Sequence, residues 1–241
     1  MPRPPAHPIP PAPGPVAAST RTDAVFDALR AAIVRCEFAP GERLRVEELG
    51  ERFDVSSSPL REALSRLVSL GLVDAFEHRG FRVAPITVAG MADLTRVRLL
   101  VEGEALRDAI ANGDDTWEAA LVASAYALSR AEQRLVDLAP TLDDAWTARH
   151  RAFHLSIYAG SSSPLLRALV EQLFDRAERY RRFSARHRTL PRRKNTEHQR
   201  LLEAVLARDA DRAAELLVCH VTSTERSVTA ALLAMDAAGL H

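Results

Sequence analysis

The apolar residues of the first third of the chain change their spacing along the sequence. Over 24–36 they recur three and four residues apart, which predicts a helix that buries one face. The same spacing predicts a short helix over 46–53 and a third helix that begins at Ser58-Pro59, with serine as the cap and proline in the first turn. The spacing then shortens, and two short apolar runs around a Gly-containing loop predict a hairpin over 72–84.

After Pro85 only long helical patterns are found. Helices of this length with short connections form antiparallel bundles. The predicted fold class is therefore mainly α: a small N-terminal helix-and-hairpin unit is followed by a six-helix antiparallel bundle. The six predicted helices span 91–112, 115–138, 142–158, 164–187, 195–208 and 210–236.

Proline content and the change of pattern divide the chain into three parts. Residues 1–20 hold most of the prolines together with Ala and Ser, so a disordered tail without a helix is predicted there. Residues 21–86 form the first predicted domain, and residues 87–241 form the second, all-helical one.

Bulk composition restricts the class of protein. No apolar run reaches the ~18–20 residues of a membrane span, and the N-terminus has no apolar signal core. Two cysteines far apart, Cys36 and Cys219, imply no disulfide framework. A cytoplasmic protein without membrane contact is expected. The net formal charge of zero argues weakly against a nucleic-acid binder, although the distribution of charge matters more than its sum.

The order of helix, short helix, turn, helix and hairpin is that of a winged helix-turn-helix. A recognition helix enters the major groove with its N-terminus first, so small and polar residues are needed in its first turn. The hairpin adds further cations that could contact DNA. The alternative is that the serines only form a helix-capping loop and that the nearby arginines are solvated surface residues. The predicted DNA-contacting residues are Ser56, Ser57, Ser58 and Arg61 at the helix, and Arg79 and Gly80 on the hairpin.

These residues also resemble the GntR family of bacterial regulators, without gaps over about residues 24–86. The resemblance implies DNA contacts at Ser56, Ser58, Arg61 and Gly80. One departure is Ser57, where the family usually has an arginine, which implies an altered operator or weaker binding. The matching motifs are Pro40-Gly41-x-x-Leu44, Glu48-Leu49, the stretch from Val55-Ser56 through Pro59-Leu60-Arg61-Glu62-Ala63-Leu64 to Leu67, Gly71-Leu72-Val73 and Gly80-Phe81-x-Val83.

Four of the eight histidines are placed to meet in the bundle. His150 and His154 are four residues apart and project from one helical face. His198 opens a later helix and His220 lies in the last one. Imidazole nitrogens suit zinc or nickel, although any single histidine is more often a surface or core residue. A zinc peptidase is rejected, because Arg151 occupies the position where the HExxH motif has its glutamate.

The helical part resembles the FCD effector domain over about residues 91–225. The pieces that match are Arg98-x-x-x-Glu102, Phe153-His154, Glu197-His198 with Leu201-Leu202-x-Ala204, and Asp209-x-x-x-Ala213 with His220. The resemblance implies a divalent metal held by three histidines, which map to His154, His198 and His220, and by an aspartate, whose position is occupied by His150.

An all-nitrogen site favours zinc or nickel over manganese. The alternative is a three-histidine site from which His150 is displaced. The resemblance further implies a small carboxylate effector, which Arg98 would bind in a bidentate fork; equally, Arg98 pairs with Glu102 on the same helical face.

The function predicted from these features is that of a homodimeric transcriptional regulator that binds palindromic double-stranded operator DNA. The resemblance implies a repressor, since repression is the commoner behaviour in the family. Its operator binding would be modulated by the carboxylate effector, and no catalytic residue is assigned. The alternative is a metal-dependent hydrolase fused to a DNA reader. That alternative needs a general base near the metal, which the spacing around His150 and His154 does not supply.

Overall fold

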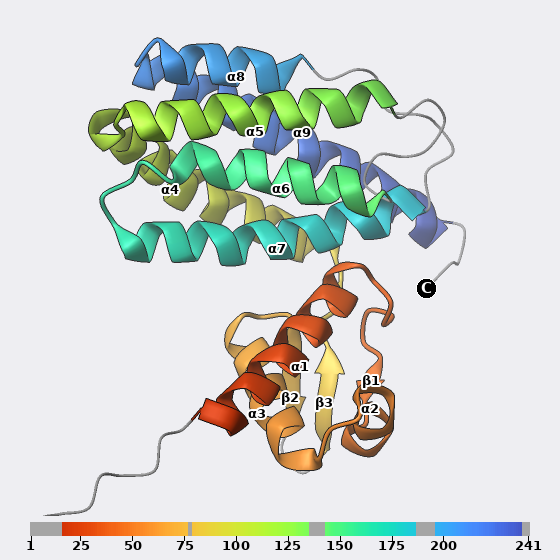
Figure 1. Cartoon of the computed structure of the whole chain (residues 1–241). Helices are drawn as coiled ribbons and strands as arrows, with labels where there is room; N and C mark the ends of the chain where they lie inside the picture. Colours follow the sequence, from red (N-terminus) through yellow and green to blue (C-terminus); the bar gives the residue numbers. More distant parts are fainter. Residues whose placement is uncertain (1–15, 77–78, 135–142, 187–195, 238–241) are drawn as a thin grey trace, which may run out of the picture.

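The computed structural model describes residues 16–76, 79–134, 143–186 and 196–237. Figure 1 shows a small unit below a larger helical bundle, joined at the start of α4. The fold is mainly helical with a small antiparallel sheet, as predicted. The small unit comprises α1 (Val16–Val34), β1 (Arg43–Leu44), α2 (Val46–Phe53), α3 (Ser57–Ser69), β2 (Val73–Phe76) and β3 (Gly80–Val83).

The small unit has its own apolar core, where α1 packs across α3. Leu29 and Ile33 from α1 and Leu60, Leu64 and Leu67 from α3 are all fully buried. The helical spacing of these leucines puts them on one face, which explains why the sequence pattern located both helices. Burial of this face leaves the opposite side of α3 in solvent.

Helix α3 has clear signals at both of its ends. Ser56 is the N-cap residue with extended backbone, and Gly71 follows the helix with a φ of +65°. Glycine adopts this left-handed conformation without the strain that a side chain would meet. The sequence thereby defines where the helix begins and ends.

The sheet has the strand order β1-β3-β2, and both pairings are antiparallel. Val73 pairs with Val83 and Phe76 with Gly80, so β2 and β3 form the predicted hairpin. Strand β1 was not predicted, because a two-residue strand is too short to show a period.

The prediction of a tail without a helix over residues 1–20 is wrong at the start of helix α1. The helix begins at Val16, so residues 16–20 are helical and do not belong to a tail without a helix. Ala17 and Ala18 are strong helix formers, and the helix continues back to Val16. Residues 1–15, the rest of the predicted tail, lie outside the described residues.

The larger unit holds the six helices that were predicted, with shifted ends. Helix α4 starts three residues early because Thr87 caps it, its hydroxyl accepting from the Gly90 backbone N–H at 3.0 Å. The last residues predicted for the second bundle helix, 135–138, lie outside the described part of the chain. The bounds are α4 (Val88–Asn112), α5 (Asp115–Arg134), α6 (Asp144–Tyr158), α7 (Pro164–Arg186), α8 (Glu197–Leu206) and α9 (Ala210–Ala237).

Helix α7 forms the floor of the bundle and faces α1 of the small unit (Figure 1). Arg30 on α1 donates to Asp175 on α7 at 2.6 Å. Farther along α7, Arg179 donates to the Ala84 carbonyl and Arg186 to the Cys36 carbonyl, the latter at 2.7 Å. The two units are therefore joined by charged contacts along one helix.

Candidate nucleic-acid interface and metal centre

The exposed first turn of α3 carries the residues predicted to contact DNA. Ser56, Ser57, Ser58 and Arg61 are all exposed at this end of the helix. The Ser56 side chain makes no capping hydrogen bond, so backbone N–H groups of the first turn face outward. Such an end attracts phosphate oxygens through its N–H groups and the helix dipole.

The hairpin presents a second set of exposed residues. Arg79 and Gly80 lie at its tip, and Gly80 has a φ of +81°, a value that favours glycine. On β3, Arg82 is exposed and donates to the Gly41 carbonyl at 3.0 Å. Exposed Arg43 on β1 is its cross-strand partner, and the pattern analysis missed it because β1 was missed. The sheet thus adds paired arginines to the surface of the hairpin.

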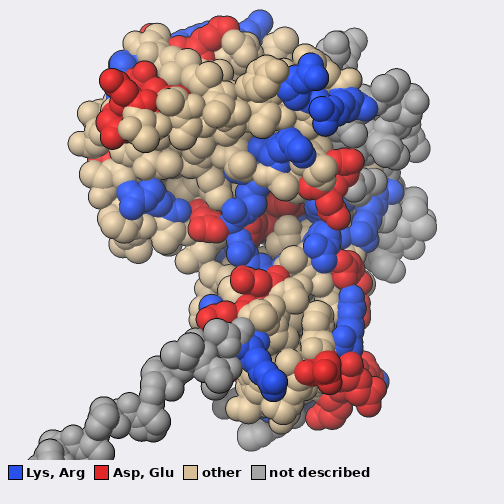
Figure 2. All heavy atoms as spheres, in the orientation of Figure 1, with Lys and Arg blue, Asp and Glu red and all other residues tan. Residues whose placement is uncertain are grey.

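Acidic residues flank the serines on the other side. Glu47, Glu48 and Glu51 are exposed on α2, and Figure 2 shows acidic side chains gathered over this part of the small unit. A hollow of about 450 Å³ lies between α2 and the start of α3, beside Ser56 and Ser57. Its lining holds three carboxylates and one cation, namely Glu47, Glu51, Asp54 and Arg21. Negative charge at this hollow disfavours phosphate, so Ser58, Arg61 and the hairpin form the more favourable side for DNA.

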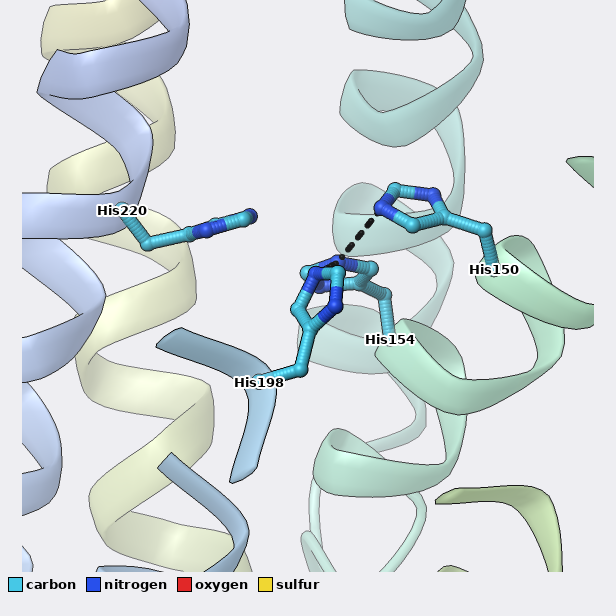
Figure 3. A group of neighbouring side chains, drawn as sticks. All are labelled: His150, His154, His198 and His220. Atoms are coloured by element: carbon cyan, nitrogen blue, oxygen red, sulfur yellow. Dashed lines mark hydrogen bonds between the residues drawn. The ribbon is translucent and has the colours of Figure 1, made fainter. Parts of the chain in front are cut away.

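The structure brings together the four histidines that the sequence singled out. His150 and His154 come from α6, His198 from α8 and His220 from α9, and their imidazoles point toward one another (Figure 3). One ring nitrogen of each lies within 4.8 Å of those of the others, and all four rings are buried. The Nε2 atom of His154 is 3.1 Å from Nε2 of His150 and 3.3 Å from Nε2 of His198.

This geometry fits a small divalent metal ion. Zinc binds histidine nitrogen at about 2.0–2.1 Å, so the nitrogens of a tetrahedral site lie about 3.3 Å apart. The two Nε2 separations from His154 match that value, and the donors are all nitrogen. The residues present therefore fit a site for zinc or nickel better than one for a metal that prefers oxygen ligands.

A carboxylate on a neighbouring helix orients one of the rings. The Nδ1 atom of His220 lies 2.8 Å from Oε2 of Glu197. Nδ1 of His198 lies 3.7 Å from Oε1 of Glu132 and has no hydrogen-bond partner among the residues that the structure describes. A proton on Nδ1 directed at a carboxylate leaves the Nε2 lone pair for a metal. Glu197 was seen in the sequence only as part of a motif, and nothing marked Glu132.

Burial keeps three of the rings uncharged at neutral pH. It lowers the pKa of His220 to about 4 and holds the pKa values of His150 and His154 well below their usual range. Neighbouring cations add to this effect, chiefly Arg181 at His150. Neutral imidazole is the form that binds metal, so at neutral pH these three imidazoles would need to lose no proton in order to bind one.

Arg98 occupies a different position in the site. It is buried on α4 and donates to Glu102 through Nε at 2.5 Å and Nη2 at 3.2 Å. Tyr158 donates to the same carboxylate at 3.0 Å. The structure therefore shows the ion pair that the sequence offered as the alternative for Arg98, close enough to His154 and His220 to lower their pKa values.

Other residues that were not predicted from the sequence also contact the cluster, among them Trp146 and Arg181. Trp146 stacks on His150, with ring centroids 4.5 Å apart, and Arg181 Nη1 lies 3.0 Å from Nε2 of His150. Trp146 is one turn before His150 on α6, so its helical spacing was the available signal. Arg181 comes from α7, and the local sequence gives no sign of its approach.

No helix in the described part of the chain is long and apolar enough to cross a membrane.

Comparison with known proteins assigns both units. Residues 21–83 match the family described as bacterial regulatory proteins, gntR family, and residues 93–223 match the FCD domain. The chain is 40% identical over 202 residues to the uncharacterized HTH-type transcriptional regulator BphR of Paraburkholderia xenovorans, covering 84% of this chain and 82% of that protein. It is also 40% identical over 193 residues to the HTH-type transcriptional repressor GlaR of Escherichia coli, covering 78% and 87%.

The fold has counterparts among solved structures. Escherichia coli McbR/YncC superposes with a TM-score of 0.70 at 24% identity, covering 90% of this chain and 98% of the other. These comparisons give no support to the hydrolase alternative, since the matched families and relatives are transcriptional regulators. The chain belongs to the GntR family and is a DNA-binding transcriptional regulator with a C-terminal FCD domain.

Proposed function

We propose that the chain is a homodimeric repressor, and not an enzyme, whose operator affinity is set by a small carboxylate effector bound beside a divalent metal. Residues 21–86 would read one half of a palindromic operator, and residues 87–241 would hold metal, effector and the partner subunit. The observation that carries the proposal is the buried cluster of four histidines in the helical domain of a GntR regulator. A repressor that binds chromosomal DNA would act in the cytoplasm.

In this proposal the metal is zinc or nickel and His150, His154, His198 and His220 bind it. Four neutral imidazoles leave the charge of a divalent ion uncompensated, in contrast to a site with one aspartate. An anionic effector is therefore attracted to the ion, and a carboxylate oxygen is the simplest ligand to complete its coordination. Arg98 lies on the α4 side of the cluster and would attract the same anion.

Helix α7 offers a physical connection between effector and DNA. Phe174 packs against His150 and His154, with ring centroids 5.9 and 5.6 Å away. The next residue, Asp175, pairs with Arg30 of the DNA-reading unit. If effector binding changes the positions of the histidines, α7 would shift. The shift of α7 would then change the orientation of the two DNA-binding domains in a dimer.

A thermal-shift screen of small carboxylates with and without zinc tests this function. A carboxylate that raises the melting temperature only when zinc is present supports the shared site, because a ligand stabilises the state that binds it. Zinc that leaves the melting temperature unchanged contradicts the metal site. The matched control is the H154N variant, which should lose the response to zinc and to the zinc-dependent carboxylate.

A further inference from the structure

Trp146 carries a polar group without a partner beside the histidine cluster. Its side chain is 2% exposed, and the indole Nε1–H has no hydrogen-bond acceptor among the residues that the structure describes. Buried N–H groups are nearly always paired, since the bond to water is lost on burial. The ring stacks on His150 at an interplanar angle of 24°. This donor is available to an acceptor on a bound molecule.

Arg181 brings a positive charge to the same imidazole. Its Nη1 atom lies 3.1 Å from Nδ1 and 3.0 Å from Nε2 of His150, and the guanidinium stands over the Phe174 ring. Arg181 and Arg182 share one buried carboxylate, Glu178. Arg182 also pairs with Asp144, whose side chain is 69% exposed. Two buried cations and one buried anion thus lie together on α7 beside His150.

We propose that Trp146 and Arg181 form an anion-binding subsite of the effector pocket, on the α6–α7 side of the histidines, that takes a carboxylate. This inference rests on the proposed function and adds residues that recognise the effector. The carboxylate would accept from the indole N–H and from the guanidinium. The contact between Arg181 and His150 would then be exchanged for one to the anion, which releases His150 toward the metal.

This arrangement predicts that metal and carboxylate strengthen each other. By linkage, a carboxylate that binds more tightly to the zinc-loaded protein raises the affinity for zinc by the same factor. Succinate and acetate are suitable probes, with chloride at equal ionic strength as the reference. Binding is measured by titration calorimetry on the full chain loaded with zinc.

The two tryptophans of the chain provide a matched pair of variants. Trp117 is also buried, but its Nε1–H already donates to the Ser156 carbonyl at 2.8 Å. W117F should therefore lower the melting temperature and leave carboxylate binding unchanged. W146F removes a donor without a partner, so it should keep the melting temperature of the ligand-free protein and weaken succinate binding about tenfold or more. In W117F the remaining indole, Trp146, should change its fluorescence when succinate is added.

The possible outcomes distinguish failure of the Trp146–Arg181 subsite from failure of the proposed function. Wild-type, zinc-loaded protein that binds neither succinate nor acetate contradicts both. Carboxylate binding that persists with equal affinity in W146F and in R181Q overturns the subsite alone, since the effector then binds elsewhere. Loss of binding in both variants with retained zinc affinity, measured with a competing chelator, supports the subsite and excludes a loss of fold.

Discussion

At the scale of single residues, Ser57 leaves the start of the recognition helix without a positive charge at that position. It stands at the start of α3, exposed, beside the acidic hollow that Glu47 and Glu51 line. An arginine here would bring a cation to the DNA phosphates. S57R should tighten binding to DNA by about 1 kcal/mol, roughly fivefold, and steepen the dependence of affinity on salt by about one released counterion.

Fluorescence anisotropy at several salt concentrations measures both effects. S69R is the matched control, because it adds the same charge to the exposed opposite end of α3. Equal gains for the two variants would mean that general attraction, and not the first turn of α3, determines binding to DNA.

Glu197 is the residue that orients His220 for a metal. Its carboxylate lies 2.8 Å from Nδ1, and E197Q keeps the shape while it removes the charge. Loss of such an outer contact typically lowers metal affinity about 10–100-fold. Competition with a chromophoric chelator measures the affinity. E203Q, on an exposed position of α8, is the control, and equal affinities of both variants would refute the orienting role of Glu197.

At the scale of elements, α6 and α9 bury histidines that become charged only at the expense of stability. The pKa of His220 is about 4 in the folded chain, against 6.5 without burial. The unfolded chain therefore binds more protons between these values, so stability present above pH 6.5 is lost as the pH falls toward 4. For His220 alone the loss is roughly 3 kcal/mol, and His150 and His154 add losses of the same sign.

Urea unfolding of metal-free protein at pH 7, 5.5 and 4.5 tests this prediction. H220N should have a smaller dependence on pH than the wild type, because one of the buried ionisable rings is absent. A free energy of unfolding that stays constant from pH 7 to 4.5 would show that the rings are solvated in the metal-free protein.

The helices and strands also show how much of the structure can be predicted from the sequence alone. Helical spacing located the long helices because each buries one regular face, and the i, i+4 spacing put His150 and His154 together. Strand β1 has two residues, too few for a period, and so Arg43 was missed with it. Arg181 approaches His150 from 31 positions away, a contact that depends on how α6 and α7 pack.

At the scale of the whole molecule, a network of charges joins the two units. Asp175 and Glu171 on α7 lie between Arg30 of the small unit and Arg151, the neighbour of His150 on α6. R30Q removes the cation on the DNA-reading side only. We expect the variant to bind DNA and zinc as the wild type does, but to lose most of the effect of zinc on operator affinity, because the two sites are then coupled less strongly.

The ratio of the operator Kd values with and without zinc measures this coupling. R96Q is the matched control: Arg96 pairs with Asp93 on the exposed face of α4. An unchanged ratio in R30Q would show that the coupling takes another path.

Sequence-specific DNA binding under the control of a metal-dependent site is best measured by a fluorescence anisotropy titration of the full chain. The titration uses DNA from upstream of its own gene and scrambled DNA of equal length, each with and without zinc. We expect salt-sensitive binding that favours the upstream sequence at least a thousandfold and that changes when zinc is added. Equal affinity for both DNAs, or a preference that zinc leaves unaltered, would show that this mode of regulation is wrong.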